Sequence, residues 1–309
     1  VEDTERARTA FENVERLNPT PESAYNLGRL SFQEDKASEA KLNYQIALQR
    51  DESFLTAAQN LAALQSGAGD TRSAIETLQN IRSHHAEDAA LTVNLANMHF
   101  QSGDLDQAEK LYREAKSANT QSSATLGLGN IALTRGDTSM AVAMYREAIT
   151  ANPDDPDAHV NLGTVWIQQG KYREAVEAFR KALELSPFDL ALYLNLSILY
   201  YHTEQYAEAL GYCRAILEQE PTMLEAQRLI GDIAIATSEL DRAIEAYGSA
   251  LRLGGDDPAS LLGIAEALNG LGRTEEAREH WRTWLDVVGE DPAYKAQIQT
   301  ITKRLEPSS

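Results

Sequence analysis

One residue recurs at an almost constant interval through most of this 309-residue chain. The intervals between its positions are 34, 34, 33, 34, 34, 34 and 34 residues, and the positions are Ala40, Ala74, Ala108, Ala141, Ala175, Ala209, Ala243 and Ala277. A period of this length is typical of stacked helical units, each of which buries its apolar face only against its neighbours. The sequence therefore predicts a solenoid of repeated units and not a single globular core.

Other positions keep the same register as the alanines. Thirteen residues before each alanine is a leucine or isoleucine, and a small residue follows it, as in Leu162 and Gly163. Four residues after each alanine is a bulkier residue, which is aromatic in most copies, as in Tyr145 and Phe179. Spacings of four and seven residues place side chains on one stripe of a helix. Each copy is therefore predicted to form two amphipathic helices joined by a polar turn.

The fifth copy carries the fullest version of the pattern. Its matching residues are Leu162, Gly163, Trp166, Gly170, Tyr172, Ala175, Phe179, Ala182 and Pro187. This order of leucine, small residue, alanine, aromatic residue and proline resembles the tetratricopeptide repeat. The resemblance implies an all-α, right-handed superhelix whose first helices line a concave groove. The second copy matches least well, because Leu78 replaces the aromatic residue and Gln65 replaces a large apolar one.

The resemblance divides the chain into one continuous array with an atypical segment at each end. Eight repeats are expected at residues 21–54, 55–88, 89–121, 122–155, 156–189, 190–223, 224–257 and 258–291. Residues 1–20 resemble the second helix of a partial repeat, and because the chain starts at Val1 we expect a processed product or a fragment. Residues 292–309 are predicted to be a capping helix and tail that cover Trp281 and Trp284.

Asparagines recur on the expected groove face, and they are the main candidates for a binding site. In five of the eight copies the residue before the repeat leucine is an asparagine: Asn26, Asn60, Asn94, Asn161 and Asn195. Further candidates lie two or five residues after their leucine: Arg29, Asn97, Asn130 and Tyr201. An amide both donates and accepts hydrogen bonds, so a ladder of amides can hold an extended peptide backbone. The alternative is that asparagine at this position serves the fold or is solvated.

Apolar residues accompany the asparagines, five positions after the repeat leucine. They are Phe32, Phe100, Leu133, Ile167, Tyr201 and Ile235. Apolar contact supplies affinity and amides fix orientation, so this combination suits a peptide ligand. Packing between helices is the alternative role for these side chains.

Charge and motifs argue against several functional classes. The chain has 28 basic and 47 acidic residues, a net charge of −19, which disfavours nucleic acid and anionic membranes and favours a partner with a basic segment. Its longest apolar run without charge, residues 190–203, is too short to span a bilayer. Residues 127–132 match a dinucleotide-binding string but lie in a predicted helix without the preceding strand. No catalytic residue, metal site or cofactor is predicted, and Cys213 is expected to be buried.

These observations predict a non-enzymatic scaffold or adaptor that binds a protein or peptide in its groove. Two alternatives stay open. One is a self-associating assembly scaffold, a homo-oligomer formed through the N-terminal end, as in bacterial envelope, secretion or organelle assembly. The other is a substrate-recruiting arm of a larger enzyme, such as a glycosyltransferase. We expect a soluble protein of the cytoplasm or the bacterial periplasm, without membrane insertion.

Overall fold

The computed structural model describes residues 2–117 and 119–306. These residues form α-helices and one short 3-10 helix, and they contain no β-strand, which confirms the predicted all-α solenoid fold. The chain divides into two compact units between Asp154 and Asp155, one residue before an expected repeat boundary. Val1, Ala118 and tail residues 307–309, which belong to predicted segments, lie outside the described residues.

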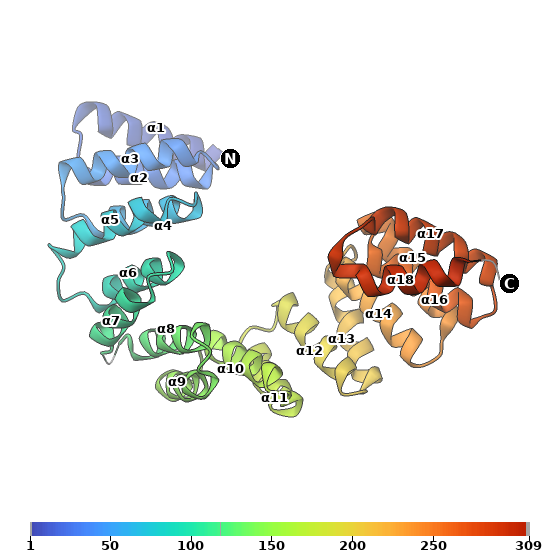
Figure 1. Cartoon of the computed structure of the whole chain (residues 1–309). Coiled ribbons are helices and arrows are strands. Elements are labelled where there is room, and N and C mark those ends of the chain that lie inside the picture. Colours follow the sequence, from blue (N-terminus) through green and yellow to red (C-terminus); the bar gives the residue numbers. More distant parts are fainter. Residues whose placement is uncertain (1, 118, 307–309) are drawn as a thin grey trace. The chain divides into compact units, whose positions relative to one another are not determined.

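Unit 1 consists of one helix followed by four helical hairpins (Figure 1). Its helices are α1 (Glu2–Leu17), α2 (Pro21–Gln33), α3 (Ala37–Arg50), α4 (Leu55–Gly67), α5 (Thr71–Arg82), α6 (Ala89–Gln101), α7 (Leu105–Ala115), α8 (Gln121–Thr134) and α9 (Thr138–Ala151). Each helix packs against the next one in the chain, and α6 also packs against α8. The hairpins of this unit therefore stack in sequence order.

Unit 2 repeats this arrangement with four hairpins and then ends in an additional helix. Its helices are α10 (Pro156–Gln168), α11 (Tyr172–Leu185), α12 (Leu190–His202), α13 (Tyr206–Gln219), α14 (Leu224–Ala236), α15 (Leu240–Gly254), α16 (Pro258–Gly270), α17 (Thr274–Val288), the 3-10 helix η1 (Pro292–Tyr294) and α18 (Lys295–Leu305). Helix α14 packs against both α12 and α16, so the first helices of the last three hairpins are in contact.

Aspartates begin many of these helices. Their side chains accept a hydrogen bond from a backbone N–H in the first turn, at Asp70, Asp88, Asp104, Asp137, Asp155, Asp189 and Asp257. Such caps satisfy N–H groups that have no partner within the helix, and the negative charge is favourable at a helix N-terminus. Part of the acidic excess of the chain therefore specifies where helices start.

Small residues explain how closely the two helices of a hairpin approach. The eight repeat alanines are fully buried, and Cys213 is buried as predicted. In the fourth repeat, a Cβ added at Gly129 would lie 2.5 Å from Cε1 of Tyr145, so only glycine leaves room for the ring. The turns need a positive φ, which Gly136 supplies at φ 82° and Asp35 adopts at φ 60° in the first hairpin.

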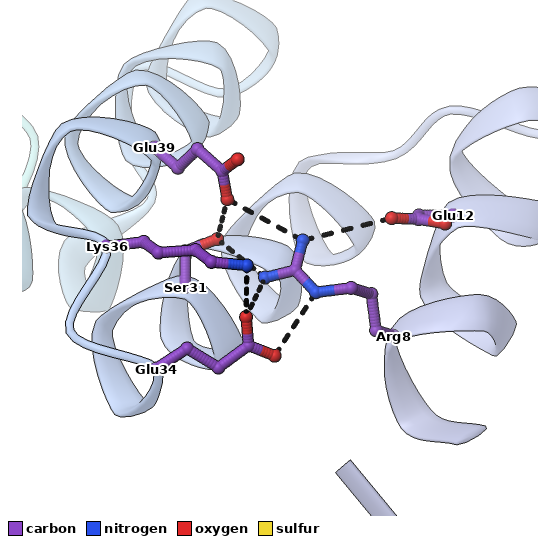
Figure 2. Close-up of polar contacts among 6 residues, drawn as sticks. All are labelled: Arg8, Glu12, Ser31, Glu34, Lys36 and Glu39. Atoms are coloured by element: carbon purple, nitrogen blue, oxygen red, sulfur yellow. Dashed lines mark hydrogen bonds and ion pairs between the residues drawn. The ribbon is translucent and has the colours of Figure 1, made fainter. Parts of the chain in front are cut away.

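Charged clusters attach α1 to the first hairpin (Figure 2). The Arg8 guanidinium is 2.8 Å from Glu34 and 3.6 Å from Glu39, and Lys36 also pairs with Glu34 at 2.8 Å. The hydrogen bond from Arg8 lowers the pKa of Glu34. A second pair joins Glu15 to Arg50 at 2.5 Å. Helix α1 is therefore held by ion pairs at two points along its length.

Helix α18 covers the last hairpin of unit 2. Trp281 and Trp284 are buried, and the core around them includes Ile301 of α18. Trp284 makes an edge contact with Tyr294, with ring centroids 5.7 Å apart, and the Arg304 guanidinium lies 5.3 Å from the Trp281 ring. The extra helix thus shields the two largest apolar side chains of this hairpin from water.

Candidate functional site

Tyrosines of the second helices bond to the first helix of the same repeat. Tyr112 donates to Asn97 Oδ1 at 2.5 Å, and Tyr145 donates to Asn130 Oδ1 at 2.8 Å. The seventh repeat has a carboxylate at this position, and Asp232 accepts from Tyr247 at 2.6 Å. The partners are 15 residues apart in each pair. Two of the predicted site residues, Asn97 and Asn130, are therefore engaged within their own repeat.

Burial changes the acidity of these paired groups. Desolvation raises the pKa of Tyr112 and of Tyr145 to about 12, so both hydroxyls remain protonated donors. Burial also raises the pKa of Asp232, against the hydrogen bond from Tyr247, and it raises the pKa of Tyr247. Each pair is therefore a largely buried hydrogen bond that joins the second helix of a repeat to its first helix.

The asparagines before the repeat leucine are held less firmly. Asn26 on α2, Asn94 on α6 and Asn195 on α12 are half-buried, and their side chains form no hydrogen bond with any residue that the structure describes. Asn60 on α4 is 3.4 Å from the Tyr25 hydroxyl and 3.5 Å from the Tyr44 hydroxyl, both long for hydrogen bonds. Asn161 is half-buried and has an interaction within the chain.

Five repeats have these asparagines, the seventh repeat has Leu229 at this position, and two repeats have glycine, which the packing explains. A Cβ added at Gly127 would overlap the Tyr112 ring, and one added at Gly263 would overlap the Tyr247 ring. This position therefore lies over the aromatic residue of the preceding repeat. An asparagine side chain at this position packs against that residue on one side and reaches solvent on the other, which accounts for the intermediate burial of the asparagines.

A hollow of about 570 Å³ lies among α2, α3 and α4 in unit 1. It brings together two of the predicted site residues, Arg29 and Asn60, with Phe32, whose side chain is 59% exposed. The other lining residues are Gln33, Ala37, Tyr44, Ala63, Leu64, Gly67 and Ala68. The hollow is within the size range of ligand pockets, and its walls are mainly apolar with a few polar groups.

One wall of the hollow, formed by α4, belongs to the second repeat, which matches the family pattern least well. Ala63 lies at the position that Asn97 and Asn130 occupy in the next two repeats. Gly67 and Ala68 have small side chains or none, so little fills the space at the end of α4. An added Cβ at Gly67 would meet no atom within 4 Å. Sequence reasoning noted Arg29, Asn60 and Phe32 but missed the small residues beside them. Their clustering at the end of α4 is visible in the sequence, but it does not indicate a hollow without the positions of α2 and α3.

The remaining candidate, Tyr201, lies on α12 in unit 2 beside other aromatic rings. Its ring centroid is 5.5 Å from that of His202 and 6.0 Å from that of Tyr206, and burial raises the pKa of its hydroxyl. Of the apolar residues expected beside the ladder, Phe32 and Ile167 are exposed, whereas Phe100 and Ile235 pack against the core. These positions thus have mixed roles.

Two further searches of the structure gave negative results for the parts of the chain that it describes. No helix there has the length and apolar character needed to cross a bilayer. The same residues contain no group of three or more histidine, cysteine or acidic side chains placed to hold a metal ion.

Comparison with solved structures identifies proteins with a similar fold. PilF of Pseudomonas aeruginosa aligns with a TM-score of 0.55 and 20% identity, over 70% of this chain and 98% of its own. A tetratricopeptide repeat protein of Parabacteroides merdae gives 0.53 and 17%, over 81% and 99%. YrrB, a tetratricopeptide repeat protein with an unusual peptide-binding site, gives 0.51 and 19%, over 61% and 97%. At these identities the likeness concerns the fold.

Comparison with family models covers most of the repeat array. One tetratricopeptide repeat model matches residues 126–189, 167–223 and 228–294, and a second matches residues 66–128. The search of curated proteins gives no match. Because the first model alone matches more than half of the chain, the protein belongs to the tetratricopeptide repeat family.

Proposed function

We propose that this protein is a non-enzymatic scaffold that binds a segment of a partner protein along the first helices of its repeats. The observation that carries the proposal is the set of half-buried amides, Asn26, Asn94 and Asn195, without hydrogen-bond partners among the described residues. A polar group in such a position gains most from a ligand that supplies the missing bonds. The fold that the chain shares with YrrB is compatible with this role.

The contrast with the tyrosine-bonded amides supports the same proposal. Asn97 and Asn130 already accept a bond from a tyrosine, and their Oδ1 atoms serve the repeat itself. Asn26 and Asn94 can offer both the donor and the acceptor of the amide to a backbone. The net charge of −19 would in addition steer a basic segment of the partner toward the protein, an effect that salt screens.

A peptide selection followed by mutation tests the role of the amides. Peptides selected from a displayed random library on the whole protein are measured by fluorescence anisotropy against Asn26→Ala/Asn94→Ala. Loss of two amides should weaken binding about tenfold or more. The matched control, Asn43→Ala/Asn80→Ala, removes two asparagines from the second helices α3 and α5. Equal affinities of the two double variants would contradict the proposal, and so would failure to select any peptide.

A second candidate function, self-association, is favoured by one observation on α1. Val14 and Leu17, one helical turn apart, are 45% and 75% exposed. A second copy that packs on this side of α1 would remove both from water. Sedimentation velocity should then show a mass that rises with protein concentration and a Val14→Ser/Leu17→Ser variant that remains a monomer. A wild-type monomer at all concentrations would exclude this function.

A further inference from the structure

We propose that the hollow among α2, α3 and α4 binds an apolar side chain from an internal segment of a partner, with an acidic residue two positions away paired to Arg29. This inference rests on the proposed function and specifies its ligand at one place. It differs from the general attraction of the acidic chain for basic segments, because the charged residue among those that line this hollow is the basic Arg29.

The walls of the hollow define the apolar part of the ligand. Phe32 on α2 and Leu64 on α4 supply apolar surface, and Ala63 on α4 leaves the space between them open. Phe32 has more than half of its side chain exposed to solvent, so covering it would contribute hydrophobic free energy. At about 570 Å³ the hollow has room for a large aliphatic or aromatic side chain together with adjoining backbone.

Polar groups lie at defined points of the same wall. Asn60 and Tyr44 both line the hollow, and the distance between Asn60 Nδ2 and the Tyr44 hydroxyl is 3.5 Å. Such a long contact holds the amide only weakly, so Asn60 can turn toward a ligand backbone. Its position beside an apolar cavity lets one residue of a peptide place its side chain inside while its backbone meets the amide.

Arg29 supplies the charge that selects the neighbouring residue. Its guanidinium lies 5.9 Å from the centre of the Tyr25 ring, and it forms no ion pair within the part of the chain that the structure describes. Arg8 and Arg50 of the same unit are, in contrast, already paired with glutamates. A ligand carboxylate can therefore bind Arg29 without breaking an existing pair, and the planar guanidinium can donate two parallel hydrogen bonds to it.

Extended geometry fixes the spacing between the two ligand groups. Alternate side chains of an extended segment point to the same side, about 6.5–7 Å apart. An apolar residue and an acidic residue two positions away can thus face the same wall, one entering the hollow and the other meeting Arg29. The amides Asn26 and Asn94 lie on first helices to either side of α4 in sequence, which favours a segment that continues past the hollow over one that ends in it.

Selections on two proteins in parallel test the charge preference. A library of random 12-residue segments, flanked on both sides by Gly/Ser linkers, is selected on the wild-type protein and on Arg29→Glu. We expect wild-type sequences to share an apolar residue with Asp or Glu two positions away, and Arg29→Glu sequences to replace the acid by Lys or Arg. A wild-type consensus without the acid, or a consensus that Arg29→Glu leaves unchanged, would overturn the inference.

Affinities of the wild-type consensus peptide test the site itself. The peptide is acetylated and amidated, which removes its terminal charges, and a version with a free C-terminus tests whether a terminal carboxylate contributes. Ala63→Phe should fill the hollow and weaken binding about tenfold, and Arg29→Glu should do the same. Lys41→Glu, an equal change of charge at an exposed residue of α3, should change the affinity less than about threefold. A free C-terminus required for binding would contradict an internal segment.

The outcomes separate this inference from the proposed function. If Asn26→Ala/Asn94→Ala weakens the peptide but Arg29→Glu and Ala63→Phe do not, the amides bind a segment and the hollow does not receive its side chain. If the wild-type protein selects no peptide, the proposed function fails together with the inference. Circular dichroism of each variant shows whether a loss of binding comes from a loss of helical structure.

Discussion

The second and fourth repeats of unit 1 each form a hairpin of two helices, but different side chains cover the first helix of each hairpin. In the fourth repeat, the Tyr145 ring packs over Gly129 and its hydroxyl donates to Asn130. The side chains of this repeat therefore cover the face of its own first helix. In the second repeat Leu78 and Ala63 occupy the positions of the tyrosine and the asparagine, and a hollow lies on that face of α4. The repeat that departs from the pattern is thus the one that offers space to a ligand.

Alkaline pH should affect the third and fourth repeats, which carry a buried tyrosine, more strongly than the second repeat, which has Leu78 at that position. Tyrosine has an ordinary pKa of 10.0, and burial raises the pKa of Tyr112 and Tyr145 to about 12. The unfolded chain therefore releases these protons first, and stability that is fully present below pH 10 is lost as pH rises through about 12. The loss should be roughly 2–3 kcal/mol per tyrosine.

Urea unfolding at pH 8 to 12, followed by circular dichroism, measures this loss. The matched control is Tyr112→Phe/Tyr145→Phe, whose unfolding free energy should fall less steeply above pH 10. Parallel curves for the two proteins would show that these hydroxyls are not protected by burial.

The same substitution at two glycines should have opposite effects. Gly129→Ala places a Cβ 2.5 Å from the Tyr145 ring and should lower the unfolding free energy by about 1–2 kcal/mol. Gly67→Ala, at the end of α4, meets no atom within 4 Å and should raise it by about 0.5 kcal/mol through helix propensity. Chemical denaturation of both variants measures the difference. A gain in stability at both positions would mean that the hairpin of the fourth repeat is packed less closely than described.

Removal of the tyrosine hydroxyl should cost less than crowding the ring. Tyr145→Phe keeps the ring but leaves Asn130 Oδ1 without its 2.8 Å donor, which should lower the unfolding free energy by about 1 kcal/mol. The second repeat provides the control, because Leu78→Met changes its buried side chain without altering a hydrogen bond and should cost less. If Tyr145→Phe is neutral at pH 8, water replaces the hydroxyl at no cost.

A small effect on stability, with a larger effect on binding, should come from converting the second repeat to the pattern of the fourth. Ala63→Asn/Leu78→Tyr reproduces the separation of 15 residues found in the tyrosine pairs. Ala62 corresponds to Ala96 of the third repeat, and that repeat has a buried tyrosine, Tyr112, at the position of Leu78. The unfolding free energy should rise by up to about 1 kcal/mol, and affinity for the selected peptides should fall because the hollow is occupied. Ala63→Asn alone should give no gain in stability. Unchanged peptide affinity in the double variant would separate the hollow from binding.

Periodicity in the sequence was sufficient to predict the helices, because each repeat reports its own register. The buried alanines and the aromatic residues four positions later follow directly from helical spacing. The bond between Tyr145 and Asn130 was not predicted, although the constant separation of 15 residues that Tyr112 and Asn97 share was visible. Periodicity alone does not distinguish the asparagines before the repeat leucine from the further candidates Asn97 and Asn130, which are bonded inside their repeats.

The hollow could not be predicted from the repeat pattern, because it forms where large side chains are lacking. Ala63, Gly67 and Ala68 are each unremarkable in a helix, and only the positions of Phe32 and Ala37 on two other helices turn their small size into a cavity. Periodicity describes what neighbouring repeats share. A binding site that arises where one repeat differs from the rest requires the spatial arrangement of all three helices.

The helix α18 that shields Trp281 and Trp284 has an evolutionary consequence. Because each repeat of such an array packs only against its neighbours, an added repeat needs an exposed apolar face to pack against. With that face taken by Ile301 and its neighbours, further growth beyond α17 would require the terminal helix to be displaced. Insertion of a repeat between two existing repeats would leave α18 in place, because the inserted repeat could pack against an equivalent apolar face on each side.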